Sequence, residues 1–86
     1  MNRQIVITFQ STHTAMAAED TFKELKLDFE LIPTPREISA ECGFALLVRN
    51  SDSNQIKLIC DQNSLRFSDI YRIYYNNGGK VYEKSD

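Results

Sequence analysis

The most apolar stretch of the sequence is Gly43-Phe44-Ala45-Leu46-Leu47-Val48-Arg49. An uninterrupted apolar run of this length, bounded by turn residues, is typical of a strand buried inside a sheet. It is far shorter than the about 20 apolar residues that cross a membrane as a helix. We therefore expect a central strand over 43–49 and no membrane-spanning segment. The polar residues 50–53 that follow, Asn-Ser-Asp-Ser, form a turn and can cap a helix.

Elements on both sides of this strand follow from hydrophobic spacing. Ile56, Ile59 and Cys60 lie on one helical stripe, which predicts a helix from the turn to about residue 64. Before the central strand, residues 3–9 alternate as a strand does. Ser11 or Thr12 can cap a helix over 12–26. Residues 28–32 then predict a short strand that Pro33 stops, and 33–43 a loop with one helical turn near 38–41.

The C-terminal third predicts one more strand, over 67–75, followed by a turn over 76–79. Residues 80–82 add either a short edge strand or a frayed end. The order β-α-β-β-α-β in 86 residues predicts a single α+β domain over 1–86. We expect a ferredoxin-like two-layer sandwich, with a four-stranded antiparallel sheet and two helices on one face. The third strand would lie between the first and second, and 76–86 would form a turn and a C-terminal tail.

Composition narrows the class of protein. The chain is 42% hydrophobic and 26% charged, which is ordinary for a globular domain. Its net charge of −2 argues against sequence-independent nucleic-acid binding. Two cysteines are too few for a secreted disulfide scaffold, and no signal peptide is evident, so we expect a cytoplasmic protein. One histidine and two cysteines eighteen positions apart cannot fill a four-ligand zinc shell without a partner chain, so we expect no metal site.

The connection over 33–43 is the candidate functional loop. It has eleven residues, whereas hairpins need about two to five, and long connections are commonly functional. The expected topology brings it to the sheet edge where the first helix begins. That edge would gather the following polar or reactive residues: Ser11, Thr12, His13, Thr34, Arg36, Ser39 and Cys42. A helix N-terminus and Arg36 favour a thiolate, so Cys42 is the candidate nucleophile, and a positive φ at Gly43 would let a ligand approach the backbone.

Plainer interpretations of the same residues stay open. A cysteine at the mouth of a strand is commonly a small buried hydrophobic residue, and Cys60 fits this description through its helical stripe. His13 and Arg36 can be solvated side chains, and Pro35 can serve only to stiffen the loop. The possibility that Cys42 and Cys60 form a disulfide is also left open by the sequence.

The loop also resembles a known family. Its run Thr34-Pro35-Arg36-Glu37-Ile38-Ser39, followed by Cys42-Gly43, is similar to the signature of small bacterial proteins labelled putative selenium/sulfur carrier protein-like. Phe9, Ser11-Thr12-His13 and the alanines after them fit the same pattern, as does Ile70-Tyr71, so the resemblance covers about 3–74.

The resemblance implies a carrier position at Cys42, in a loop shaped by Pro35, Arg36, Ser39 and Gly43. Its only bound group would be a covalent persulfide or selenide on Cys42, with no other cofactor, and its partners would be a protein donor and acceptor. Sulfur carriers of the sulfurtransferase type have a Cys-Pro-x-Pro motif at a helix start. Here the prolines precede Cys42 by seven and nine positions.

Two functions from different classes follow. The first is a sulfur or selenium carrier, or a thiol-dependent accessory protein, that uses Cys42 and is not a turnover enzyme. The second is a non-catalytic binding or regulatory module that acts through the open sheet face or the 33–43 edge. That face would present Val6, Thr8, Ile32, Ala45 and Leu47, which is too apolar to stay bare. We therefore expect a homodimer or a hetero-complex, and no nucleic-acid or membrane partner.

Overall fold

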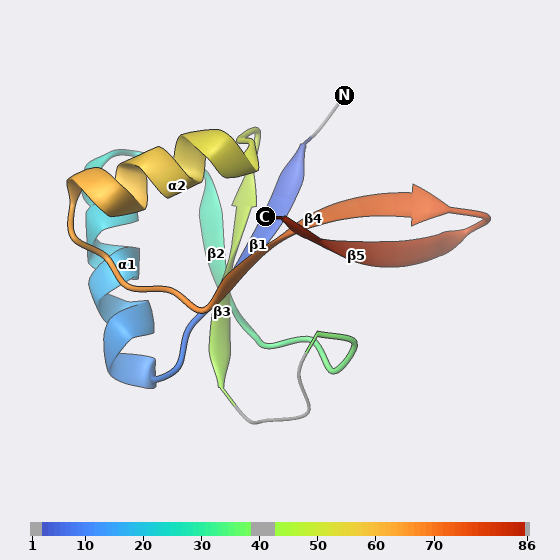
Figure 1. Ribbon diagram of the computed structural model, residues 1–86, viewed down its shortest axis with the longest axis horizontal. Coiled ribbons are helices and arrows are strands. Elements are labelled where there is room, and N and C mark those ends of the chain that lie inside the picture. Colours follow the sequence, from blue (N-terminus) through green and yellow to red (C-terminus); the bar gives the residue numbers. More distant parts are fainter. Residues whose placement is uncertain (1–2, 39–42, 86) are drawn as a thin grey trace.

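Strand β1 (Gln4–Thr8) is the middle strand of a five-stranded antiparallel sheet with the order β2-β3-β1-β4-β5. The computed structural model describes residues 3–38 and 43–85. The other strands are β2 (Phe29–Pro33), β3 (Phe44–Arg49), β4 (Asp69–Asn76) and β5 (Gly79–Ser85). Helices α1 (Thr12–Glu24) and α2 (Ser53–Gln62) lie together on one face of the sheet (Figure 1). The α+β class and the position of β3 between β1 and β2 are confirmed.

The expectation of a four-stranded sheet is wrong, because the C-terminal residues form a fifth strand instead of a tail. β5 pairs with β4 along its whole length, from Asn76 opposite Gly79 to Ile70 opposite Ser85. Asn77 and Gly78 link the two strands with φ values of 49° and 80°. Two central residues with positive φ are what a type I′ turn requires, and this turn matches the twist of the strands that it joins.

Other boundaries differ by small amounts from those expected. Pro33 is the last residue of β2, which tolerates a proline because it is an edge strand. In the following loop, the amide of Ile38 donates a hydrogen bond to the Pro35 carbonyl at 3.0 Å, which closes a turn over 35–38. This turn begins before the helical turn expected near 38–41, most of which falls on residues 39–42, outside the described residues.

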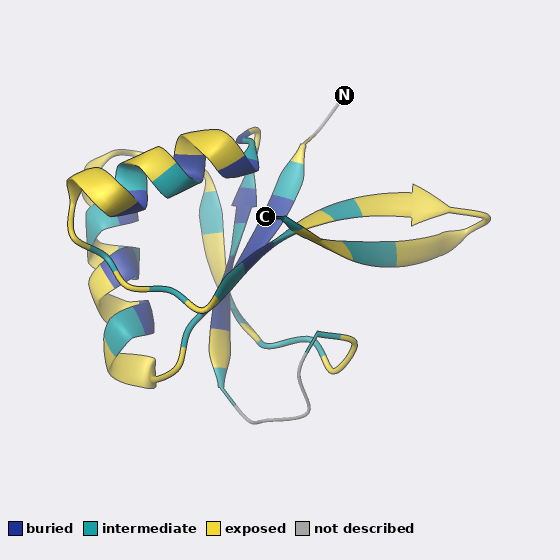
Figure 2. Ribbon diagram, viewed as in Figure 1, coloured by how far each residue is buried: buried dark blue, intermediate teal, exposed yellow. Residues whose placement is uncertain are grey.

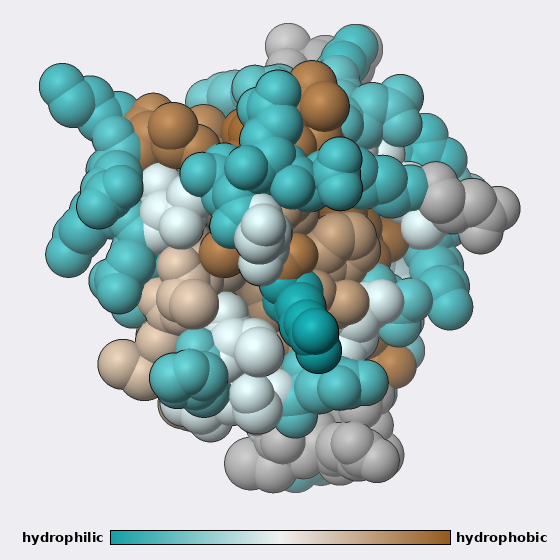
Figure 3. Space-filling view, turned by 60° about the vertical axis from the view of Figure 1, so that its left-hand side comes forward, coloured by the Kyte–Doolittle hydropathy of each residue, from teal (hydrophilic) through white to brown (hydrophobic). Residues whose placement is uncertain are grey.

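The core lies between the helices and the sheet (Figure 2). Phe22 of α1 is fully buried and meets the Phe29 ring edge-on, with 6.0 Å between the ring centres. The rest of this buried cluster consists of Ile5, Ile7, Ala18, Leu46, Val48, Ile56, Cys60 and Ile70. Apolar side chains also reach the surface on the helical side, where Figure 3 shows them among polar ones. No helix in the described part of the chain is long and apolar enough to cross a membrane.

The opposite side of the sheet is called the outer face here. Strand register places on it the central row Glu30, Leu47, Val6, Tyr71 and Lys84, one residue from each strand. The neighbouring rows add Ile32, Ala45, Thr8 and Asp69 on one side, and Arg49, Gln4, Ile73 and Tyr82 on the other. All five residues that the sequence predicted for this face therefore lie there.

Candidate functional site

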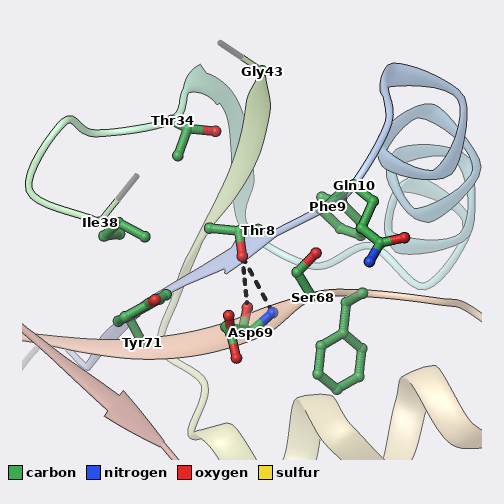
Figure 4. Close-up of a pocket in the computed structure, with 10 residues that line it drawn as sticks. Thr8, Phe9, Gln10, Thr34, Ile38, Gly43, Ser68, Asp69 and Tyr71 are labelled. Carbon is green, nitrogen blue, oxygen red and sulfur yellow. Dashed lines mark hydrogen bonds between the residues drawn. The ribbon is translucent and has the colours of Figure 1, made fainter. Parts of the chain in front are cut away.

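A pocket of about 720 Å³ opens at the end of the sheet where β1 terminates and β4 begins. The end of β1 and the residues after it supply three lining residues, Thr8, Phe9 and Gln10. The 33–43 connection supplies Thr34, Ile38 and Gly43. The start of β4 and the segment before it supply Phe67, Ser68, Asp69 and Tyr71. In Figure 4 these side chains come from three directions around one space.

Hydrogen bonds fix the floor of this pocket. Thr8 Oγ1 accepts from the backbone amide of Asp69 at 3.2 Å and donates to the Asp69 carbonyl at 3.4 Å (Figure 4). The amide of Ser68 donates to the Thr8 carbonyl at 2.8 Å. The amide of Thr34 donates to the Gly43 carbonyl at 3.0 Å. These bonds join the two ends of the 33–43 connection, and the end of β1 to the start of β4, so the pocket has a rigid base.

Charge in the pocket comes from one carboxylate. Asp69 is the only charged residue among the described residues that line it, and Lys84 Nζ lies 3.2 Å from Asp69 Oδ1. The rest of the lining is hydroxyl, amide, aromatic and aliphatic. Within the described part of the chain no cation lines the pocket, so positive charge for an anionic group there would have to come from a residue at the pocket margin.

The structure separates the predicted site residues into three groups. Thr34 and Gly43 line the pocket. Pro35 and the exposed Arg36 belong to the turn that Ile38 closes at the pocket margin. Ser39 and Cys42 lie outside the described residues. Gly43 does not have a positive φ, so the condition under which its backbone would let a ligand approach closely is not met. Among the described residues, a Cβ atom at Gly43 would meet Thr34 Oγ1, at 3.8 Å.

The start of α1 is exposed and does not line the pocket. Ser11, Thr12 and His13 are all exposed. The Ser11 hydroxyl accepts from the Thr14 amide at 3.3 Å, so the predicted N-cap is confirmed. The capping oxygen is therefore directed to its own helix, and Phe9 and Gln10 are the described residues of this connection that line the pocket.

Sequence reasoning missed the contribution of β4. Phe67, Ser68, Asp69 and Tyr71 line the pocket because β4 runs antiparallel to β1, which puts its start beside the end of β1. The expected strand order already contained this consequence. No local motif marks these four residues, so topology was the only available signal.

Cys60 is the cysteine that the structure describes, and its thiol is unsuited to act as a nucleophile. Its side chain is 1% exposed within the core cluster. Burial raises the pKa of Cys60 to about 11, because an apolar environment disfavours the thiolate. At neutral pH it is therefore a protonated, inaccessible thiol, as the helical stripe predicted.

No arrangement in the described residues suits a metal ion, since no three His, Cys, Asp or Glu side chains cluster there. No curated protein and no solved structure matches the chain. The model of one family matches residues 4–72, which is most of the chain and includes β1 to β3, both helices, the 33–43 connection and the first half of β4. That family is described as "Putative Se/S carrier protein-like", and the chain belongs to it.

Proposed function

We propose that this protein carries sulfur or selenium on Cys42 between a donor protein and an acceptor protein. The observation that carries the proposal is the position of Gly43. It follows Cys42 directly in the chain and lines an open, rigid-based pocket. The description of the family supports sulfur or selenium as the class of cargo. A reducing, cytoplasmic location fits a thiol that must stay free to react.

The properties of Cys60 support Cys42 as the carrier position by elimination. Cys60 is buried and its pKa is raised to about 11, so it cannot compete as a nucleophile at neutral pH. The chain has two cysteines, which leaves Cys42 as the acceptor of the cargo. Arg36, an exposed cation in the turn beside the pocket, would stabilise a persulfide or selenide anion there.

The proposed loading step needs no external oxidant. The Cys42 thiolate attacks the terminal sulfur of a persulfide on the donor, and a new S–S bond forms on Cys42. The S–S bond of the donor breaks at the same time, and its electron pair leaves with the donor sulfur as a thiolate. Delivery to the acceptor is the same exchange with the roles reversed.

Incubation with a cysteine desulfurase and cysteine tests the proposal. We expect a mass gain of about 32 Da, located on Cys42 by peptide mapping. Cys42→Ser should gain nothing, whereas the matched variant Cys60→Ala should load like the unmodified protein. Arg36→Ala should lower the rate of loading by at most about five-fold, because an exposed charge contact is screened by water.

Loading on Cys60, or on neither cysteine with any donor, would contradict the carrier proposal. The second candidate, a non-catalytic binding module, would then be preferred. It is favoured by one observation, the partly exposed apolar and aromatic residues Leu47, Tyr71, Ile73 and Tyr82 on the outer face.

A further inference from the structure

The outer face carries a charge at each of its two edges. At the β2 edge, the carboxylates of Asp28 and Glu30 share one guanidinium, that of Arg49, at 3.3 and 2.7 Å. That edge keeps an excess of one negative charge. At the β5 edge, Lys84 pairs with Asp69, while Lys80 makes no ion pair with any described residue and lies 5.8 Å from the centre of the Tyr82 ring. Counted over the described residues, that edge keeps an excess of one positive charge.

The middle of the same face is apolar and aromatic. Leu47, Tyr71 and Ile73 are partly exposed between the two charged edges. Val6 at the centre is fully covered by its neighbours. An apolar centre with charged residues at its margins is the usual composition of a protein–protein interface.

The β4–β5 ribbon extends this surface beyond the rest of the sheet. β4 pairs with β1 only as far as Ile73, whereas Tyr74, Tyr75 and Asn76 pair with β5 alone. The ribbon projects away from the helices (Figure 1), and Tyr75 on its outer face is 67% exposed. A two-stranded ribbon is marginally stable in water by itself, so exposed aromatic residues on it indicate a partner.

We propose that the outer face binds a second copy of this chain, with the two-fold axis parallel to the strands. Rotation about that axis lays the β5 edge of each copy over the β2 edge of the other. In the central row, Glu30 then lies opposite Lys84 of the other copy, and Leu47 lies opposite Tyr71 of the other copy. The β2 edge of each copy, with its excess negative charge, faces the β5 edge of the other copy, with its excess positive charge. The two-fold symmetry repeats this contact, so the dimer contains it twice.

Other arrangements of two copies lack this match. A two-fold axis in the plane of the sheet but across the strands would lay β2 over β2 and β5 over β5, which opposes like charges. The proposed axis also brings both Thr34–Ile38 turns to the same end of the dimer. The proposal does not depend on Cys42 and stands or falls separately from the carrier proposal.

Charge reversal with sedimentation velocity tests the dimer. The unmodified protein should sediment as a dimer at tens of micromolar and shift toward monomer as salt is raised. Glu30→Lys alone and Lys84→Glu alone should each weaken dimerisation at least about ten-fold, because each puts like charges together twice. An equimolar mixture of the two variants should dimerise again, since both contacts between unlike variants are attractive.

Lys23→Glu is the matched control, because Lys23 is an exposed cation on α1, away from the outer face, and its reversal should leave the dimer unchanged. Circular dichroism of each variant shows whether it stays folded once its internal ion pair is lost. A monomer at 200 μM (about ten times the working range) overturns the proposal. So does a dimer that survives both single reversals, or a mixture no more dimeric than its components.

Discussion

Thr8 and Asp69 hold the pocket floor together through two hydrogen bonds that run in opposite directions between the same residues. The Thr8 hydroxyl accepts from the Asp69 amide at 3.2 Å and donates to the Asp69 carbonyl at 3.4 Å. Thr8 is only 7% exposed, so water replaces these bonds poorly if they are lost. The pair fixes the register of β1 and β4 where both strands reach the pocket.

Thr8→Val should lower the free energy of unfolding by about 1–2 kcal/mol, because the shape is kept while a buried amide loses its partner. Urea unfolding followed by circular dichroism measures this. Thr21→Val is the matched control, since the Thr21 hydroxyl only bonds back to the Ala17 carbonyl of its own helix. If both variants lose the same free energy of unfolding, the hydrogen bonds of Thr8 to Asp69 add no stability beyond that of an ordinary threonine in a helix.

The turn between β4 and β5 depends on Gly78. Its φ of 80° lies in the left-handed region, which costs a residue with a side chain about 1 kcal/mol. Gly78→Ala should therefore destabilise the hairpin by about that amount, measured as a lower midpoint in thermal unfolding. Gly79→Ala is the control, because Gly79 does not have a positive φ and a Cβ atom there meets the Asn76 carbonyl at an ordinary 3.5 Å. If Gly79→Ala is the more damaging change, the turn type is wrong.

Thiol accessibility gives a third prediction. In the native protein Cys60 should react with iodoacetamide far more slowly than in urea, because it is 1% exposed and its pKa is raised. Cys42 should be labelled faster than Cys60 in the native state. Timed alkylation followed by peptide mass mapping measures both rates in one sample. Equal native rates for the two cysteines would remove thiol chemistry from the proposed function.

Local patterns predicted most of the fold because they report burial directly. Ile5 and Ile7 alternate with polar or outward residues, and Ile56 and Cys60 share a helical stripe; all four are buried in the core as predicted. The fifth strand was underestimated for a physical reason. Residues of β5 are mostly charged, polar or glycine, so their own β propensity is weak. Pairing is imposed by the Asn77-Gly78 turn and by β4, which single-strand patterns do not represent.

The candidate site was predictable only to the level of topology. Strand order placed Thr34 and Gly43 at the end of the sheet where β1 terminates, and both residues line the pocket. The expected meeting with Ser11 and His13 depended on side-chain directions, which spacing does not encode. Ser11 instead caps its own helix, as free amides in a first turn require. The roles of Ser39 and Cys42 remain predictions for the experiments above.

Cys60 also predicts how stability depends on pH. Burial raises the pKa of Cys60 from 9.0 to about 11 in the folded protein. Between these values the unfolded chain has lost the thiol proton while the folded chain keeps it. The unfolded state then binds fewer protons, so the free energy of unfolding falls as pH rises, by at most about 1.4 kcal/mol per pH unit. Below pH 8 both states hold the proton and this contribution vanishes.

Urea unfolding under reducing conditions at pH 7.5 and pH 10.5 measures this fall. Tyrosines and lysines titrate in the same range, so the comparison that isolates Cys60 is with Cys60→Ala. That variant should be less stable at pH 7.5, because a buried sulfur is lost from the core. The difference should shrink by about 1–2 kcal/mol at pH 10.5, since alanine has no proton to lose. A difference that stays the same at both pH values would mean that Cys60 titrates alike in the folded and unfolded states, and that its thiol is not shielded in solution.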